Sequence, residues 1–127
     1  KAKLRNDLLT ASENDIAKIR TENQLKQAAI AKGDDDARYA RLAAGAQFDL
    51  ELQRSLLEQK KAADDAYYAN ALANENLTAE QIRELNEKKL SDQIFYTEKS
   101  NEIERNRRNV LESNIYLVKT YSEDDDW

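Results

Sequence analysis

The chain has 127 residues, of which 35% are charged and 40% apolar, and it contains no proline, cysteine or histidine. Its net charge of -5 argues against a general nucleic-acid binder, because affinity for phosphate depends on an excess of lysine and arginine. The absence of cysteine excludes a disulfide scaffold and thiolate zinc sites, and the composition as a whole is typical of long helices.

A mean hydropathy of -0.92 leaves too little apolar surface for a thick core. We therefore expect residues 1–127 to form a single elongated helical domain or fragment. No apolar run approaches the ~20 residues of a membrane span, and no secretory leader is recognisable. Because Lys1 stands first and methionine is absent, we expect the chain to be part of a longer protein.

The first predicted helix covers about residues 13–32. Ser12 and Asp15 resemble a capping box, so the helical pattern of residues 1–11 is expected to be interrupted before them. Downstream, three isoleucines share one stripe, which we interpret as a weak core face: Ile16, Ile19 and Ile30.

Gly33 provides a C-terminal stop, and Asp34, Asp35 and Asp36 provide caps and negative charge for the first turn of a second helix. This second helix is predicted from about residue 37 to residue 73. Its apolar face is wider than a two-stranded seam needs, which favours three helices around one core. The residues of its two stripes include Tyr39, Leu42, Ala43, Ala46, Leu50, Leu52, Leu56, Leu57, Ala63 and Ala66.

The boundary after this helix has several coinciding signals. Asn74 to Asn76 end an alanine-rich run, and Thr78 and Gln81 form a capping box. Leu77 and Ile82 are placed as its hydrophobic staple. Such a short link favours an antiparallel hairpin.

The third helix is predicted from residue 79 to about residue 121, followed by an acidic tail at residues 122–127. One seven-residue column runs along it: Ile82, Lys89, Tyr96, Ile103, Val110 and Leu117. In a hairpin, Asp49 and Glu51 are expected to partner Arg105, Arg107 or Arg108. The expected fold class is thus all-α, as a long-helix antiparallel hairpin or a slender three-helix bundle or coiled coil, about 60 to 70 Å long.

The sequence predicts no metal, cofactor or catalytic site. Asp34–Asp36 and Asp124–Asp126 lack the spaced ligands of an EF-hand, so we interpret them as helix caps and solvated charge. Without histidine or cysteine, the commonest general base and the best nucleophile are missing, and we expect no enzyme.

A local basic patch comprises Arg105, Arg107 and Arg108 with Asn106 and Asn109. It is interpreted as an exposed, salt-bridged face, with contact to phosphate or an acidic partner as the alternative. The paired aromatics are expected to pack in the core or at an interface: Tyr67 and Tyr68, Phe95 and Tyr96, Tyr116 and Tyr121.

Three stretches, LRNDLL (residues 4–9), DLELQRSLLEQK (residues 49–60) and NLTAEQIRELNEKKLSDQ (residues 76–93), resemble the helical parts of phage and prophage tail tape measure proteins. The resemblance implies a structural role in the virion tail, with tail length set during assembly and with tube, tip and chaperone proteins as partners. It carries over no catalytic residue. The stops at residues 33 and 74–78 depart from an uninterrupted extended tape.

Two functions are compatible with these features. The first is a non-enzymatic structural or assembly segment of a larger elongated protein, associating with itself or with components such as the tail tube. The alternative is a helical interaction module, an adaptor or chaperone-like bundle that presents residues 97–109 to a partner. Outside a virion tail, we expect a soluble chain with neither specific nucleic-acid binding nor a membrane span.

Overall fold

The structure, a computed structural model, describes the backbone of residues 2–124 and its side chains except those of residues 2, 6, 8, 11 and 120–124. All regular structure in this part of the chain is helical, which confirms the predicted all-α class. The helices are α1 (Ala2–Gly45), α2 (Leu50–Leu72) and α3 (Ala79–Asp124).

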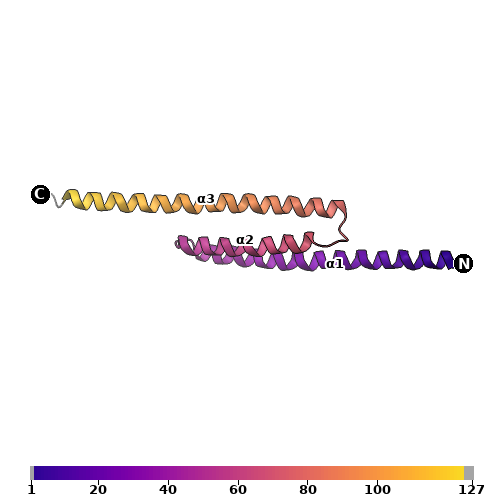
Figure 1. Cartoon of the computed structure of the whole chain (residues 1–127). Helices are drawn as coiled ribbons and strands as arrows, with labels where there is room; N and C mark the ends of the chain where they lie inside the picture. The colour runs from indigo at the N-terminus through magenta and orange to yellow at the C-terminus, as the bar shows by residue number, and fades with distance from the viewer. Residues whose placement is uncertain (1, 125–127) are drawn as a thin grey trace.

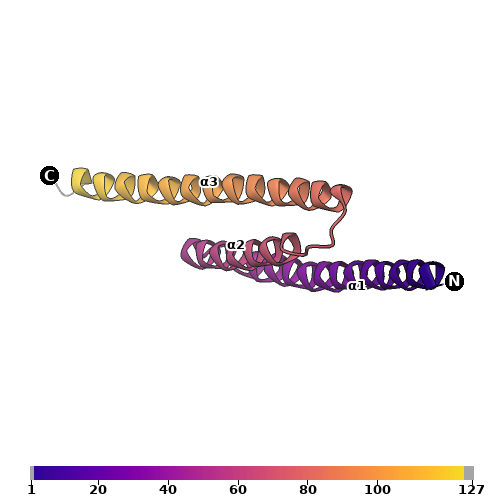
Figure 2. The same cartoon turned by 45° about the vertical axis from the view of Figure 1, so that its right-hand side comes forward.

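The short helix α2 packs against both long helices, and the chain reverses direction before and after it (Figure 1). The long helices overhang α2 at opposite ends, as both views show (Figure 2). We call residues 21–106 the central region, residues 2–20 the N-terminal arm and residues 107–124 the C-terminal arm. Every described side chain of residues 107–119 is exposed, and so is every described side chain of residues 3–20 except the half-buried Ala17, so no other described segment covers either arm.

The first chain reversal lies at residues 46–49, and the predicted break at Gly33 is wrong. The side chain of Asp49 caps α2 by accepting a hydrogen bond of 3.0 Å from the Leu52 amide. Gln53 Nε2 donates to the carbonyls of Ala46 and Gln47, both at 2.8 Å, and so holds the turn. These side-chain bonds carry no strong sequence signature, whereas a lysine-glycine pair does.

Helix α1 continues through Gly33 because glycine costs a helix interior only about 1 kcal/mol, which contacts from neighbouring helices readily outweigh. No described residue has a positive φ, so the terminator geometry is not used. Asp34 to Asp36 therefore lie inside α1 rather than at a helix start. The predicted helix restart at Ser12 and Asp15 is also wrong, because α1 is unbroken there.

The helix boundary predicted at Thr78 is present in the structure. The Thr78 amide donates to Gln81 Oε1 at 2.9 Å, and the Gln81 amide donates to Thr78 Oγ1 at 3.1 Å, so the capping box is confirmed. Helix α3 begins at Ala79, as predicted, and is helical through Asp124, three residues beyond the predicted end. Asn74 Nδ2 donates to Gln24 Oε1 at 3.1 Å and ties this turn to α1.

The central region contains two small apolar clusters. One joins Leu57, Tyr96 and Ile103, with Tyr39 and Phe95 packed against it. The other joins Tyr68, Ala71 and Leu85 and is flanked by Leu25, Tyr67, Leu72 and Leu77. Charged residues occupy the level between the clusters, so the core is not continuously apolar.

The predicted core face of the first helix points to solvent. Ile16, Ile19 and Ile30 are 53%, 58% and 62% exposed. The face that α1 turns inward carries Thr21, which is buried, and Lys32, which is half-buried. Apolar periodicity selected the wrong face because the inward face contributes charged groups to the core.

None of the described helices contains an apolar stretch long enough to cross a membrane.

Candidate functional site

A cluster of charged side chains at the middle of the central region joins all three helices. We call it the charge network: Lys32 and Asp36 from α1, Lys60 and Asp64 from α2, and Asp92 from α3. Each lysine lies one helical turn before an aspartate of its own helix, and each also contacts a carboxylate of another helix. The network therefore links the three helices at one level.

The two lysines share the carboxylates between them. Lys32 Nζ lies 2.8 Å from Asp36 Oδ2, 3.0 Å from Asp92 Oδ2 and 3.7 Å from Asp64 Oδ1. Lys60 Nζ lies 2.5 Å from Asp64 Oδ2 and 2.9 Å from Asp36 Oδ1. Asp36 thus bridges two ammonium groups, and no lysine of the network faces only its own helix.

Aromatic rings complete the surroundings of both lysines. Lys32 Nζ lies 5.7 Å and 5.8 Å from the ring centres of Tyr68 and Tyr67. Lys60 Nζ lies within 5.8 Å of the rings of Tyr39, Phe95 and Tyr96. Such cation–π contacts are stronger where water is excluded, so the rings help to hold the lysines charged.

Two tyrosine hydroxyls donate to carboxylate oxygens that the lysines also contact, Oδ2 of Asp64 and Oδ2 of Asp92. Tyr96 donates a hydrogen bond to Asp64 and Tyr68 donates one to Asp92. Asp64 is only 2% exposed, and no buried side-chain nitrogen or oxygen among the described residues is without a partner. A fully satisfied network of this kind is compatible with a core, because only unpaired buried charges are strongly unfavourable.

The pKa of each carboxylate depends on whether burial, which raises it, outweighs the neighbouring lysines, which lower it. Burial raises the pKa of Asp64, and the nearby Lys60 and Lys32 offset this only in part. Burial acts in the same direction on Asp36, but hydrogen bonds from Lys32 and Lys60 outweigh it and lower the pKa of Asp36. The carboxylate of Asp36 is therefore held as an anion between the ammonium groups of Lys32 and Lys60.

The pKa values of Lys32, Lys60 and Tyr68 are all raised. Burial would lower the pKa of Lys32 and Lys60, but their hydrogen bonds to aspartates outweigh it and raise both pKa values. Burial raises the pKa of Tyr68, and its hydrogen bond to Asp92 raises it further. The lysines remain ammonium ions and are poor nucleophiles in this setting.

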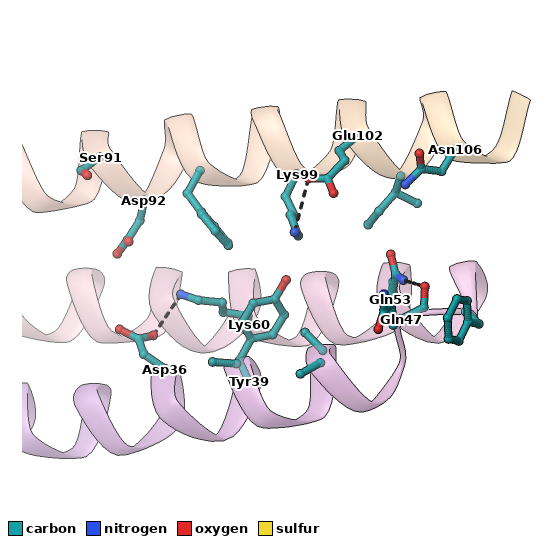
Figure 3. A pocket seen from close by; sticks show the side chains of 16 residues that line it. Asp36, Tyr39, Gln47, Gln53, Lys60, Ser91, Asp92, Lys99, Glu102 and Asn106 are labelled. Carbon is teal, nitrogen blue, oxygen red and sulfur yellow. Dashed lines mark hydrogen bonds and ion pairs between the residues drawn. The ribbon is translucent and has the colours of Figure 1, made fainter. Parts of the chain in front are cut away.

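A groove of about 910 Å³ runs between α1 and α3 beside the network (Figure 3). Asp36, Tyr39 and Lys60 border it on one side, and Asp92 and Lys99 border it on the other. Its α1 wall consists largely of alanines, namely Ala40, Ala43 and Ala44. The groove forms because the backbones of α1 and α3 do not touch.

The residues singled out from sequence are not brought together. Of the first aspartate cluster only Asp36 joins the network, and the described residues contain no group of side chains that could hold a metal ion. Asp124 ends α3, and residues 125–127 of the second cluster lie outside the described part. Asp49 caps α2 and Arg107 lies 3.9 Å from Glu104 of its own helix, so the described ion pairs do not include the predicted ones between helices.

The aromatic pairs divide between the core and the surface. The rings of Tyr67 and Tyr68 meet edge to face at 4.9 Å, and those of Phe95 and Tyr96 at 5.9 Å, as expected for core packing. Tyr116 is exposed on the C-terminal arm, and the side chain of Tyr121 lies outside the described set.

The network itself was not predicted from sequence. Its one local signal is a lysine followed four residues later by an aspartate, which occurs at Lys32–Asp36 and again at Lys60–Asp64. The same spacing joins Lys61 to Asp65 on the exposed surface, so spacing alone does not separate core pairs from surface pairs.

No protein-family model matches the chain, and neither a curated protein nor a solved structure is significantly similar to it.

Proposed function

We propose that the chain is a non-enzymatic structural or assembly segment of a larger elongated protein, of the kind found in phage tail tape measure proteins. The observation that carries this proposal is the pair of single-helix arms that extend the central region in opposite directions (Figure 1). Each arm spans distance as a single helix, which suits a spacer. In the tail setting the partners are tube components and the location is the virion tail.

The charge network supports a mechanical role. Buried polar groups have their best-attested use in fixing the alignment of packed helices, because any shift leaves charges unpaired. Asp64 is buried too deeply for a substrate to reach it, and its carboxylate oxygens already contact Lys32, Lys60 and Tyr96. We assign the network the task of holding the central region as a slender three-helix bundle in which α2 and α3 form an antiparallel hairpin.

A deletion experiment tests the tape-like role. The residues of this chain are removed in frame from the full-length gene, and tail length is measured by electron microscopy. A folded segment shaped as in Figure 1 contributes about 95 Å of length, whereas a continuous helix contributes about 190 Å. Unchanged tail length would reject the tape-like role, and a shortening near either value would tell the folded from the extended state.

The second candidate is a helical protein-interaction module. The groove between α1 and α3 favours it, because alanines line one wall and Phe48, which is 95% exposed, stands at one end. A partner helix with small or apolar side chains fits such a surface. Ala43→Glu and Ala44→Glu should abolish capture of such a partner while leaving the helices folded, and Ala62→Glu on the exposed face of α2 is the matched control.

A further inference from the structure

The C-terminal arm continues the core-facing column of α3 beyond the end of the central region. Tyr96 and Ile103 of this column are buried, but Val110 and Leu117, at the next two seven-residue steps, are each 52% exposed. The column remains apolar where none of the described residues covers it. This arrangement calls for a cover from outside the chain.

A second apolar row lies beside this column. Leu111, Ile115 and Val118 have the four-then-three spacing of a coiled-coil seam, and each is more than half exposed. Together the two rows give the arm an apolar face without a partner among the described residues. Contiguous exposed apolar faces of this kind mark interaction sites.

We propose that two copies of this chain associate through their C-terminal arms, which lie side by side and antiparallel. The occupant of each exposed face is the same face of the other copy, so the interface is isologous. The inference does not rest on the proposed function, since it uses only the shape, charge and exposed surface of the arm.

Charge complementarity favours this pairing. Glu112 and Lys119 lie seven residues apart on one flank of the seam, and both are exposed. In an antiparallel pair of identical helices each flank meets the same flank of the partner. When two arms overlap fully over residues 107–124, Glu112 of each copy lies opposite Lys119 of the other, which gives two ion pairs by symmetry.

The length of the arm fits the same arrangement. Residues 107–124 extend about 27 Å beyond the central region. In a fully overlapped pair, each arm ends beside the turn at residues 46–49 of the other copy. That turn carries Phe48, the most exposed of the large apolar side chains described, which the arriving arm would cover.

The association is expected to be weak. A specific interface needs about 1,000 Å² of buried surface, and two paired arms of this length supply an area on that order. A reversible dimer that forms at micromolar to millimolar concentration follows from an interface near this lower limit.

Sedimentation velocity on the full chain, from about 1 µM to 1 mM, measures the association. The unmodified chain should shift from monomer to dimer as concentration rises, and Ile115→Glu should raise the dimer dissociation constant at least about 100-fold, since it places a charge in the seam. Ile16→Glu, on the exposed stripe of the N-terminal arm, is the matched control and should leave that constant unchanged. A chain that stays monomeric throughout, or a control that abolishes association while Ile115→Glu does not, would overturn the proposal.

A charge exchange tests the orientation without disturbing the seam. Glu112→Lys or Lys119→Glu alone should weaken the dimer about fivefold to tenfold, because each creates two like-charge contacts. The double exchange should restore the original constant, since it re-forms both pairs with the charges reversed. In a parallel pair these residues do not meet, so failure of the double exchange to restore association contradicts the antiparallel arrangement.

Discussion

At the scale of single residues, the feature that distinguishes this protein is a charged centre where a thin bundle would be expected to place leucines. Lys60 and Asp64 are nearly inaccessible to solvent, with 9% and 2% of their side-chain surface exposed. Replacing such groups by apolar residues of similar volume is often neutral or stabilising, so their presence is better explained by alignment than by stability. Removing a single partner is a different matter, because it leaves a buried charge behind.

Asp64→Ala should lower the free energy of unfolding by about 3 kcal/mol, the range found when one partner of a buried ion pair is lost. In this variant the ammonium of Lys60 still forms its ion pair with Asp36, but the hydroxyl of Tyr96 loses its hydrogen-bond acceptor. Urea denaturation measures the change. The neighbouring Asp65→Ala is the matched control and should cost under about 0.5 kcal/mol, because the pair of Lys61 and Asp65 is largely exposed. Equal losses in the two variants would contradict a buried network.

Stability should fall as the pH rises above about 10. Lys32 and Lys60 have raised pKa values, so their contribution is complete below their ordinary pKa of about 10.4 and is lost as the pH rises through the folded values. Tyr68 also has a raised pKa, so the unfolded chain releases its proton first, which favours unfolding in the same window. Melting temperatures between pH 7 and 11.5 measure the effect.

The Tyr68→Phe variant should show a shallower decline of stability with pH, because it lacks a phenol whose pKa burial and Asp92 raise. At the acid end, Asp36 and Asp64 have pKa shifts of opposite direction, so their contributions partly cancel. A melting temperature that stays constant to pH 11.5 would show that these groups are solvated rather than buried.

At the scale of the elements, the main question is where the chain bends. Strong local terminators at Gly33 are overridden, while weaker signals around Asp49 mark a real helix start. Local propensities of about 1 kcal/mol are smaller than the cost of about 3 kcal/mol or more that arises when a buried charge such as Lys60 loses its partner on another helix, here Asp36 of α1.

Gly33→Ala should stabilise the protein by about 0.5 to 1 kcal/mol, since alanine favours a helix interior and no atom lies within 4 Å of the added Cβ. Thermal and urea denaturation measure the gain. If the chain instead ended a helix at this glycine with a positive φ, the same substitution would destabilise it. The sign of the change therefore discriminates between a continuous α1 and a break.

Thr78→Ala should cost about 1 kcal/mol, because the hydroxyl of Thr78 accepts a hydrogen bond from the Gln81 amide at the start of α3. Thr97→Ala is the control, since the Thr97 hydroxyl donates to the carbonyl of Gln93 inside the helix and caps nothing. The urea midpoint should fall for the first variant and stay constant or rise for the second. An unchanged midpoint for Thr78→Ala would show that water replaces the cap.

At the scale of the whole molecule, the position of the first turn sets the length. A break at Gly33 would have given a second and a third helix of similar extent that overlap along most of their length, about 60 to 70 Å in total. With the turn at residues 46–49, α2 is only half as long as its neighbours and cannot cover them. The overhanging ends become the arms, and apolar residues on them remain exposed.

Small-angle scattering should give a maximum dimension of about 90 to 100 Å for the monomer, from the helical rise along the N-terminal arm, central region and C-terminal arm. The Ile115→Glu variant is suited to this measurement, because it is expected to stay monomeric. A value near 65 Å would show that the arms fold back, and a value above about 150 Å for a verified monomer would show that the reversals are absent.

The sequence by itself determined the helical class and the boundary at Thr78. Both depend on local chemistry: composition without proline favours helix, and a capping box is formed by side chains only three residues apart. The hairpin or slender bundle expected from sequence stays a prediction for the chain in solution.

Only the tertiary structure decided which face of α1 is buried, where the first turn lies and that charges fill the middle of the core. Each of these depends on groups far apart in the sequence, such as Lys60 and Asp36 or Lys32 and Asp92. Apolar periodicity cannot detect a buried face whose central members are lysine and aspartate. Burying such a face becomes favourable only when other helices supply the opposite charges. The sequence of one helix alone does not indicate those charges.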